Sequence, residues 1–295
     1  MKRALVTVMA AVAVVLPASM AGGVPDVPLR LALFQHGTIF HSGLMHTHTV
    51  ALTFDDGPNA HTAEVLDALK ELNVKATFFI VGNQARRHPD ILARIAREGH
   101  LLANHSATHS VLGAAYDANP RALIEQVRQV DEQIAPLMGP HTMRFFRAPY
   151  GVWKHAHQDI LNADPVLRAY IGPIYWDIGG DMRMSRDGYV MAAADWSCWR
   201  KGWSPHTCAK GYTREIRRKD GGVVLMHCIQ INSAALVREV VPPLIAEGYR
   251  FVRLDQVPEY RRYETPPDYR PTRPGGVAGG RDAPRRLAAN TVNTR

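Results

Sequence analysis

Two adjacent aspartates stand at the end of an apolar run near the start of the chain. Residues 50–54 (Val-Ala-Leu-Thr-Phe) precede Asp55 and Asp56, and Gly57-Pro58 follows at once. The run predicts a buried strand, and Gly-Pro indicates a turn directly after it. Two like charges this close require a compensating cation, an arginine or a shared proton. In isolation the pattern is also that of a solvated Asp-Asp-Gly turn between two elements.

Two histidines four residues apart offer such a cation a place to bind. His105 and His109 follow a short predicted strand at 100–104. A spacing of four is about one helical turn, so both imidazoles can point the same way and bind one metal ion. The alternative is a pair of surface histidines in a polar loop. Two histidines and a carboxylate would leave coordination positions open for water and substrate, as a hydrolytic metal requires.

Two further polar residues also lie where predicted strands end. Arg147 ends the segment 144–147, and His227 lies near the end of the apolar run 222–228. An arginine can compensate one of two crowded carboxylates. Histidine is the side chain best suited to supply a proton near neutral pH. Taken alone, these residues would indicate an ordinary salt bridge and a histidine of the core.

The order of the predicted elements sets the fold class. Strands alternate with helices at least five times, which predicts a parallel α/β architecture, either a barrel or an open sheet. In both, functional side chains gather at the carboxyl ends of the strands. We predict strands at 50–54, 75–81, 100–104, 144–147, 173–178, 222–228 and 250–254, and helices at 61–72, 89–98, 120–134 and 232–246, the last capped by Asn232.

Four motifs in chain order resemble the polysaccharide deacetylase family. They are Thr-Phe-Asp-Asp-Gly-Pro at 53–58, His-Ser-x-x-His at 105–109, Arg-x-Pro-Tyr-Gly at 147–151 and Leu-x-His at 225–227. This is the chitooligosaccharide deacetylase homology domain of the fourth carbohydrate esterase family, and the resemblance spans about 48–254. It implies a distorted (β/α) barrel with parallel strands and an open groove that contains a metal.

The resemblance also implies an acid and a base. Asp55 matches the general base that deprotonates the attacking water, and Arg147 matches the residue that orients this carboxylate. His227 matches the general acid that protonates the leaving amine. An amine leaves poorly unless it is protonated, so the chemistry agrees with these roles.

A metal site and two substrate contacts follow from the same resemblance. Asp56, His105 and His109 match the metal ligands. The expected cofactor is one divalent ion, zinc in the first place with cobalt as an alternative. Tyr150 matches the position whose backbone N–H stabilises the oxyanion, and Leu225 matches the apolar wall against the acetyl methyl group.

One family motif is displaced in this chain. The family carries an Asp-Trp pair whose aspartate tunes the catalytic histidine. Here Asp181 stands near the expected place but is followed by Met182, whereas Asp195-Trp196 lies inside a weakly periodic insertion at 179–220. Either Asp181 keeps the position in sequence or Asp195 fills it in space. We favour Asp195 slightly, because Trp196 would also supply a groove wall.

The chain contains three cysteines. Cys198 and Cys208 are ten residues apart in the insertion, and an exported protein permits a disulfide, so we predict that these two are paired. Cys228 lies in an apolar strand pattern and is expected to be a buried free thiol. The chain has no Cys-x-x-Cys pair, which argues against a zinc site built on cysteines.

The two ends of the chain read differently from the rest. Residues 1–21 resemble a secretory signal, with Lys2 and Arg3 before an apolar stretch and cleavage expected after Ala21. An uncleaved anchor is the alternative. We predict an irregular lead-in at 22–47, a catalytic domain at 48–262 and a disordered tail rich in Pro, Gly and Arg at 263–295.

The composition of the chain limits the cellular surroundings and the binding partners that we expect for the protein. The formal net charge of +8 favours anionic surroundings such as a cell wall, and no nucleic-acid-binding module is recognisable. We therefore expect a secreted or periplasmic, envelope-associated monomer without a transmembrane span in the mature chain, whose partner is an acetylated polysaccharide and not nucleic acid.

Three functions compete at this stage. The first is a metal-dependent N-deacetylase acting on peptidoglycan, a chitin-like glycan or an exopolysaccharide. The second keeps the site and changes the bond, as an O-acetyl esterase or a non-sugar amidase would. The third is a glycan-binding protein without catalysis, against which a complete metal triad counts.

Overall fold

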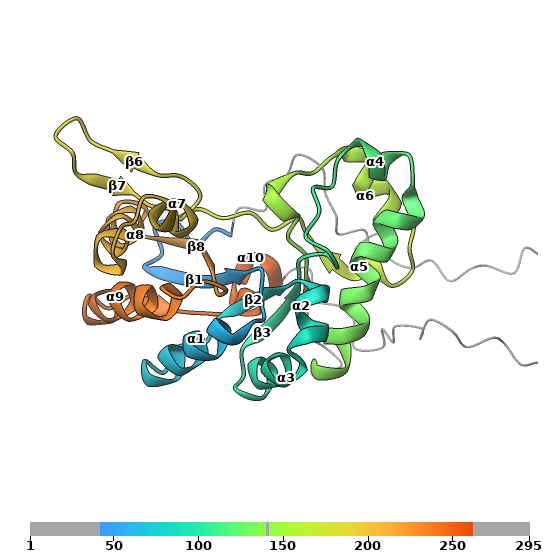
Figure 1. The fold of residues 1–295 in the computed structure, drawn as a ribbon, viewed down its shortest axis with the longest axis horizontal. Coiled ribbons are helices and arrows are strands. Elements are labelled where there is room, and N and C mark those ends of the chain that lie inside the picture. Colours follow the sequence, from blue (N-terminus) through green and yellow to red (C-terminus); the bar gives the residue numbers. More distant parts are fainter. Residues whose placement is uncertain (1–41, 140–141, 262–295) are drawn as a thin grey trace, which may run out of the picture.

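A parallel sheet forms the centre of the molecule, in a computed structural model that describes residues 42–139 and 142–261 (Figure 1). The predicted signal segment, most of the lead-in and the predicted tail lie outside the described residues. The strand order is β3-β2-β1-β8, and β9 pairs with β1 as well. These strands are β1 Thr49–Asp55, β2 Thr77–Ile80, β3 Leu101–Asn104, β8 Gly221–His227 and β9 Arg250–Phe251.

Strand β1 lies at the middle of the sheet and is buried along its whole length. Its partner β8 pairs with it from Thr49↔Gly221 to Asp55↔His227. The other edge of β1 is shared, with β9 beside its first residues and β2 beside its last ones. Every pairing in this sheet is parallel, so the carboxyl ends of β1, β2, β3 and β8 meet at one edge.

The two edges of this sheet are linked by one segment, 170–178. It begins with β5 (Tyr170–Ile171), which pairs with β4 (Arg144–Phe145), and the chain beyond β4 bridges to β3 at Asn104↔Phe146. The segment ends at Ile178, whose N–H donates to Val223 O of β8 over 3.1 Å. The sheet is therefore curled and its edges are joined, as in a distorted barrel. The parallel α/β fold class is confirmed.

The predicted strand at 173–178 is wrong in its bounds. The regular pairing comes earlier, in β5, and only Ile178 forms a bridge to β8. Pro173 explains the interruption, because proline has no N–H to donate to a neighbouring strand.

Helices cover the sheet. Figure 1 shows α3, α1, α9 and α8 side by side, and the contacts between α1 and α3, α1 and α9, and α8 and α9 agree. No described helix combines the length and the apolar character that a membrane span requires. The helices are α1 Ala60–Glu71, α2 Gly82–Arg87, α3 Pro89–Arg97, α4 Ala114–Asp117, α5 Pro120–Ile134, α6 His155–Asn162, α7 Asp195–Arg200, α8 Pro205–Lys219, α9 Ser233–Ala246 and α10 Pro258–Arg261, with short 3-10 turns at Ala135–Leu137, Pro149–Gly151, Leu167–Ala169 and Leu254–Gln256.

Local sequence signals explain where most of the predicted helices begin. The Asn59 side chain accepts hydrogen bonds from the first turn of α1, and the Thr62 Oγ1 accepts one from the Asn59 N–H over 2.9 Å, a capping box. Asn119 caps α5 in front of Pro120. Asn232 is at the N-cap position of α9 as predicted, but its side chain makes no capping hydrogen bond.

The insertion at 179–220 is more regular than its sequence pattern predicts. It contains a hairpin of β6 (Arg183–Met184) and β7 (Val190–Ala192), which projects beyond α8 in Figure 1, and then α7 and α8. Helix α8 buries Cys208, Ala209, Gly211, Tyr212, Thr213, Glu215 and Ile216. Small and polar residues dominate this buried face, so the helical period is weak in a hydrophobicity pattern.

Candidate functional site

A pocket of about 640 Å³ opens where the strands end. Asp55 and His227 end β1 and β8, and His105 directly follows β3, so three of the polar side chains are placed by strand ends. The lining residues are Asp55, Asp56, His105, His109, Ala148, Tyr150, Trp176, Gly180, Trp196, Arg200, Leu225, His227, Ile229 and Gln230.

Asp56 lies beside both histidines of the His-Ser-x-x-His motif. Its Oδ1 is 3.0 Å from His109 Nε2 and 3.5 Å from His105 Nε2. One ligand atom from each of the three residues lies within 4.8 Å of the others. Asp56 reaches this position with a backbone φ of 73°, a left-handed turn directly after β1.

The two imidazoles meet through a loop and not through the helical turn that the spacing suggests. Residues 105–109 form no helix, and Ser106 and His109 have φ values of 67° and 56°. The Ser106 hydroxyl accepts a hydrogen bond from the His109 N–H, which closes the turn. The ring centroids lie 5.0 Å apart, so the expected proximity is found by a different route.

The arrangement fits a divalent metal. His105 Nδ1 donates to Arg147 O over 2.8 Å, which fixes the tautomer and leaves Nε2 free to act as a ligand. Asp56 Oδ1 is buried and has no hydrogen-bond partner among the described residues. Two imidazoles and a carboxylate are a common donor set for zinc. A cation would satisfy the buried oxygen.

Electrostatics also favour a charged Asp56. Burial by itself would raise the pKa of this carboxyl group. The neighbouring imidazoles of His105 and His109 and the charge of His227 outweigh burial, and they hold the pKa well below its usual range. The carboxylate is therefore suited to act as an ionised ligand.

Asp55 has a different partner. Its Oδ1 accepts a hydrogen bond from Arg147 Nη1 over 2.6 Å, and both side chains are almost fully buried. Its Oδ2 faces His105 Nε2 at 3.5 Å. Arg147 thus compensates one carboxylate of the crowded pair, while the three-residue cluster surrounds the other.

The Arg147 side chain makes several further contacts that fix its position. Its guanidinium also donates to Thr53 Oγ1 at 2.9 Å, to Ile174 O at 3.0 Å and to Tyr175 O at 3.3 Å. The Phe79 ring lies 4.0 Å from its central carbon. These supporting contacts carry no signal in the sequence, because they come from β1, from the irregular segment 170–178 and from Phe79 of β2.

His227 is held by Asp195. The Asp195 Oδ1 lies 2.8 Å from His227 Nδ1, and the Oδ2 accepts the His227 N–H over 2.6 Å. Burial lowers the pKa of His227, but Asp195 and then Asp56 and Asp55 raise it well above its ordinary value. A cation at Asp56 would remove part of this effect and leave Asp195 as the main cause.

Asp195 is itself positioned from two sides. Its side chain accepts the N–H of Trp196 over 2.7 Å, and its own N–H donates to Tyr212 Oη over 3.0 Å. Tyr212 Oη in turn donates to Leu225 O of β8 over 3.0 Å. Tyr212 is not predictable from the sequence, since a tyrosine on the buried face of a helix carries no signal of such a role.

The structure decides between the two candidate aspartates. Asp195 contacts His227, whereas Asp181 is exposed and makes no hydrogen bond to it. The interpretation that Asp181 keeps the motif position is therefore wrong for this fold. The chain leaves the pocket after Gly180 to form the β6–β7 hairpin, and α7 brings Asp195 back.

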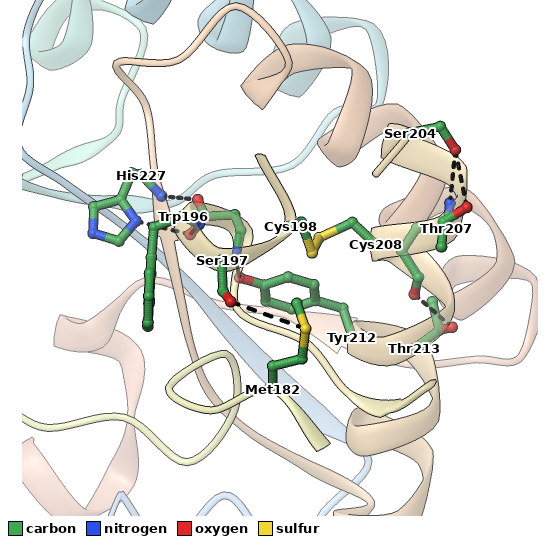
Figure 2. The surroundings of a disulfide bond; sticks show 12 residues. Met182, Trp196, Ser197, Cys198, Ser204, Thr207, Cys208, Tyr212, Thr213 and His227 are labelled. Atoms are coloured by element: carbon green, nitrogen blue, oxygen red, sulfur yellow. Dashed lines mark hydrogen bonds and ion pairs between the residues drawn. A yellow bond between two sulfur atoms is a disulfide. The ribbon is translucent and has the colours of Figure 1, made fainter. Parts of the chain in front are cut away.

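Helix α7 is fastened to α8 by a disulfide between Cys198 and Cys208. Figure 2 shows this bond between the two helices, with Trp196 and His227 to its left and Tyr212 below it. Cys228 is a buried free thiol, and burial raises its pKa to about 12. The disulfide therefore ties down the element that carries Asp195 and Trp196.

The remaining predicted residues also line the pocket. Tyr150 is 65% exposed and its ring centroid lies 4.7 Å from that of His109. Trp196 is 43% exposed, and Leu225 is buried at the pocket floor in β8. Two aromatic faces therefore flank a small apolar surface beside the triad.

Two carboxylates, three imidazoles and a nearby buried arginine thus converge at the carboxyl ends of a parallel α/β sheet. The sequence profile described as polysaccharide deacetylase matches residues 43–166. A solved structure of the Bc1960 peptidoglycan N-acetylglucosamine deacetylase is 30% identical, with a TM-score of 0.54, over 71% of this chain and 87% of that one. The chain belongs to the polysaccharide deacetylase family.

Curated relatives with deacetylase names also match this chain, but over smaller fractions of their own length. A chitooligosaccharide deacetylase of Rhizobium leguminosarum bv. trifolii is 38% identical over 130 residues, covering 44% of this chain and 56% of that protein. The peptidoglycan-N-acetylglucosamine deacetylase PgdA of Listeria monocytogenes serotype 1/2a is 30% identical over 211 residues, which cover 70% of this chain and 38% of that protein. The chain spans about half the length of the first curated relatives it matches.

Proposed function

We propose that this chain is an exported, metal-dependent hydrolase that removes N-acetyl groups from the amino sugars of a cell-envelope polysaccharide. One observation carries the proposal. A base, Asp55 on Arg147, and an acid, His227 on Asp195, face the same pocket on either side of Asp56 and its two histidines. The relatives, whose names are chitooligosaccharide deacetylase and peptidoglycan-N-acetylglucosamine deacetylase, support this substrate class.

Asp56, His105 and His109 would hold the metal. A divalent ion there would act as a Lewis acid toward water and the acetyl carbonyl. Zinc suits two imidazoles and a carboxylate, and cobalt is the alternative. The donation from His105 Nδ1 to Arg147 O keeps this ligand in the required tautomer.

Asp55 would act as the general base. Its Oδ1 is engaged by Arg147, so its Oδ2, which faces the triad, remains to accept the proton of the attacking water. Arg147 compensates the charge of this carboxylate and fixes its direction. Hydroxide adds to the acetyl carbon and the carbonyl becomes a tetrahedral oxyanion, toward which the Tyr150 N–H would donate.

His227 would act as the general acid. The carboxylate of Asp195 at its Nδ1 favours the protonated ring, so Nε2 carries a proton toward the pocket. Transfer of this proton to the sugar nitrogen lets the C–N bond break, which releases acetate and a free amine. Asp195 positions the histidine and does not touch substrate.

The groove fits a pyranose that carries an acetamido group. Leu225 offers an apolar contact to the acetyl methyl, and the exposed rings of Tyr150 and Trp196 offer flat faces to sugars. We further propose that residues 48–262 form the catalytic domain and that residues 1–21 direct its export.

The test couples metal analysis to acetate release. Purified protein loaded with zinc or cobalt should release acetate from N-acetylated glycans, and removal of the metal by a chelator should abolish release until metal is restored. Oligomers of N-acetylglucosamine and peptidoglycan strands would be compared with O-acetylated xylan. Faster release from the ester would move the activity to O-deacetylation. Stoichiometric metal with no release from any substrate would contradict the proposal and favour glycan binding alone.

A further inference from the structure

Arg200 lines the pocket without a partner of opposite charge. It is the last residue of α7, its side chain is exposed, and it makes no hydrogen bond or ion pair with any residue that the structure describes. Its guanidinium carbon lies 5.5 Å from the centroid of the Trp196 ring, within the range of a cation–π contact. The contact keeps the cation beside the pocket.

The charges around the pocket make this arginine distinctive. Among the described lining residues, Arg200 is the only lysine or arginine. The two lining carboxylates already have other partners: Asp55 is paired with Arg147, and Asp56 lies among the imidazoles. Neither compensates Arg200, so the pocket presents an uncompensated cation at one rim.

A guanidinium group at the edge of a pocket is suited to bind a carboxylate of the ligand. Arginine binds carboxylates with two parallel hydrogen bonds, and a nearby aromatic face gives the same wall an apolar platform for a sugar ring. An uncharged glycan requires no such cation. We propose that Arg200 binds a carboxylate carried by the glycan, and that the protein therefore prefers an acidic polysaccharide. The inference rests on the proposed function, because it names the glycan class that the same pocket takes.

The position of Arg200 also indicates where that carboxylate would lie. Trp196, on which the guanidinium rests, directly follows Asp195, the partner of His227. Figure 2 shows Trp196 beside His227. Arg200 is therefore on the side of the pocket from which the leaving nitrogen would receive its proton. A carboxylate on the reacting sugar, such as an ether-linked lactyl group, or on the next sugar, such as a uronate, could reach it.

The experiment compares each acidic strand with its neutral derivative. One probe is a peptide-free strand of alternating N-acetylglucosamine and N-acetylmuramic acid, and a second alternates N-acetylglucosamine with a uronic acid. Each is also converted to its methyl amide, which removes the charge and leaves the acetamido groups intact. Acetate release gives kcat/KM for each strand, and calorimetric titration gives the affinity without turnover.

Wild-type protein should prefer one of the acidic strands over its amide by about tenfold, the value of one charge-assisted hydrogen bond at an exposed site. This preference should weaken as salt is added. The ratio should fall close to one in Arg200→Gln and recover partly in Arg200→Lys. Lys201→Gln is the matched control, because it removes the same charge at the next residue, which does not line the pocket.

The two proposals fail in distinguishable ways. An unchanged ratio in Arg200→Gln, an equal loss in Lys201→Gln, or a wild type that does not distinguish acid from amide would overturn the role of Arg200. Acetate released from none of the strands would overturn the deacetylase proposal, and the binding titration would then still decide whether Arg200 selects the acid. The strand that shows the preference identifies the source of the carboxylate.

Discussion

The pocket has two walls that are built by different means. The strand wall comprises Asp55, Asp56 and His105, each at or directly after the end of a parallel strand, with Arg147 behind Asp55 two residues after β4. The helix wall comprises the residues of α7, Asp195–Arg200. The strand wall is placed by backbone hydrogen bonds of the sheet. The helix wall is placed by side chains, namely the disulfide to α8 and the Tyr212 hydroxyl.

This difference between the two walls indicates how functional roles are divided between them. A strand end fixes a side chain to within the register of the sheet, which suits groups that must meet a metal and a base. A short helix held by a few contacts can vary in length and sequence while it still delivers one aspartate to His227. The strand wall is therefore expected to carry the chemistry, and the helix wall to tune it and to select substrates.

The largest expected effect comes from separating the two aspartates of the strand wall. Asp55→Asn should lower kcat by about a thousandfold, since it removes the proposed general base, and should keep the metal because Asp56 and both histidines remain. Asp56→Ala should lose the metal itself. Metal content by mass spectrometry and acetate release measure both. Equal loss of metal in the two variants would show that the division of roles is wrong.

The helix wall should respond more mildly. Asp195→Asn keeps the shape beside His227 and removes the charge that favours its protonated ring. We expect kcat to fall by about 10- to 100-fold with KM and bound metal nearly unchanged, as for other groups that orient a functional residue. Asp181→Asn is the matched control, because Asp181 is exposed and does not touch His227. A comparable loss in the control would remove the distinction drawn between the two aspartates.

The disulfide tests whether the helix wall depends on its tether. The double variant Cys198→Ser/Cys208→Ser should reduce the free energy of unfolding by about 3 kcal/mol for a loop of this length. It should also lower kcat, because α7 carries Asp195, without loss of metal. Urea unfolding and turnover are the measurements. In denatured wild type a thiol assay should find one free group, Cys228, and a count of three would mean that the bridge is absent.

His100 lies outside both walls, so its titration allows folding stability to be tested separately from catalysis. Burial, together with the charge of Lys75, lowers the pKa of His100 to about 4, and its Nδ1 accepts the Ala76 N–H over 3.1 Å. The unfolded chain binds a proton at this histidine below about pH 6.5, whereas the folded protein resists it until about pH 4. Stability from this group is therefore complete above pH 6.5 and is lost as the pH falls toward 4.

His100→Asn should flatten that acid dependence, because the amide oxygen can still accept the Ala76 N–H but does not titrate. The change in unfolding free energy between pH 6.5 and 4 should become smaller by about 2 kcal/mol. Denaturant unfolding at several pH values measures it, and metal content at pH 7 should be unaltered. An acid slope identical to that of wild type would show that other groups dominate.

The sequence predicts most of the strand wall. In the helix wall it predicts individual residues, namely Asp195, Trp196 and the Cys198–Cys208 pair, but not the helices α7 and α8 that carry them. Strands ending at Asp55, before His105 and at His227 could be placed because parallel strands are short apolar runs with clear stops. The loop that brings His109 to His105 could not, since it depends on left-handed backbone at Ser106 and His109. Helix α8 could not be predicted from a hydrophobicity pattern, because its buried face is made mostly of small and polar residues.

What the sequence alone determined is the set of residue types and their order, because each motif lies in one short stretch whose chemistry is readable locally. It determined the family, the parallel α/β class and the residues at the strand ends. Only the tertiary structure decided that Asp195 and not Asp181 meets His227, and that Arg200 faces the pocket. Those choices depend on how the insertion folds back through the disulfide and Tyr212, contacts between segments whose separation along the chain carries no signal of their distance in space.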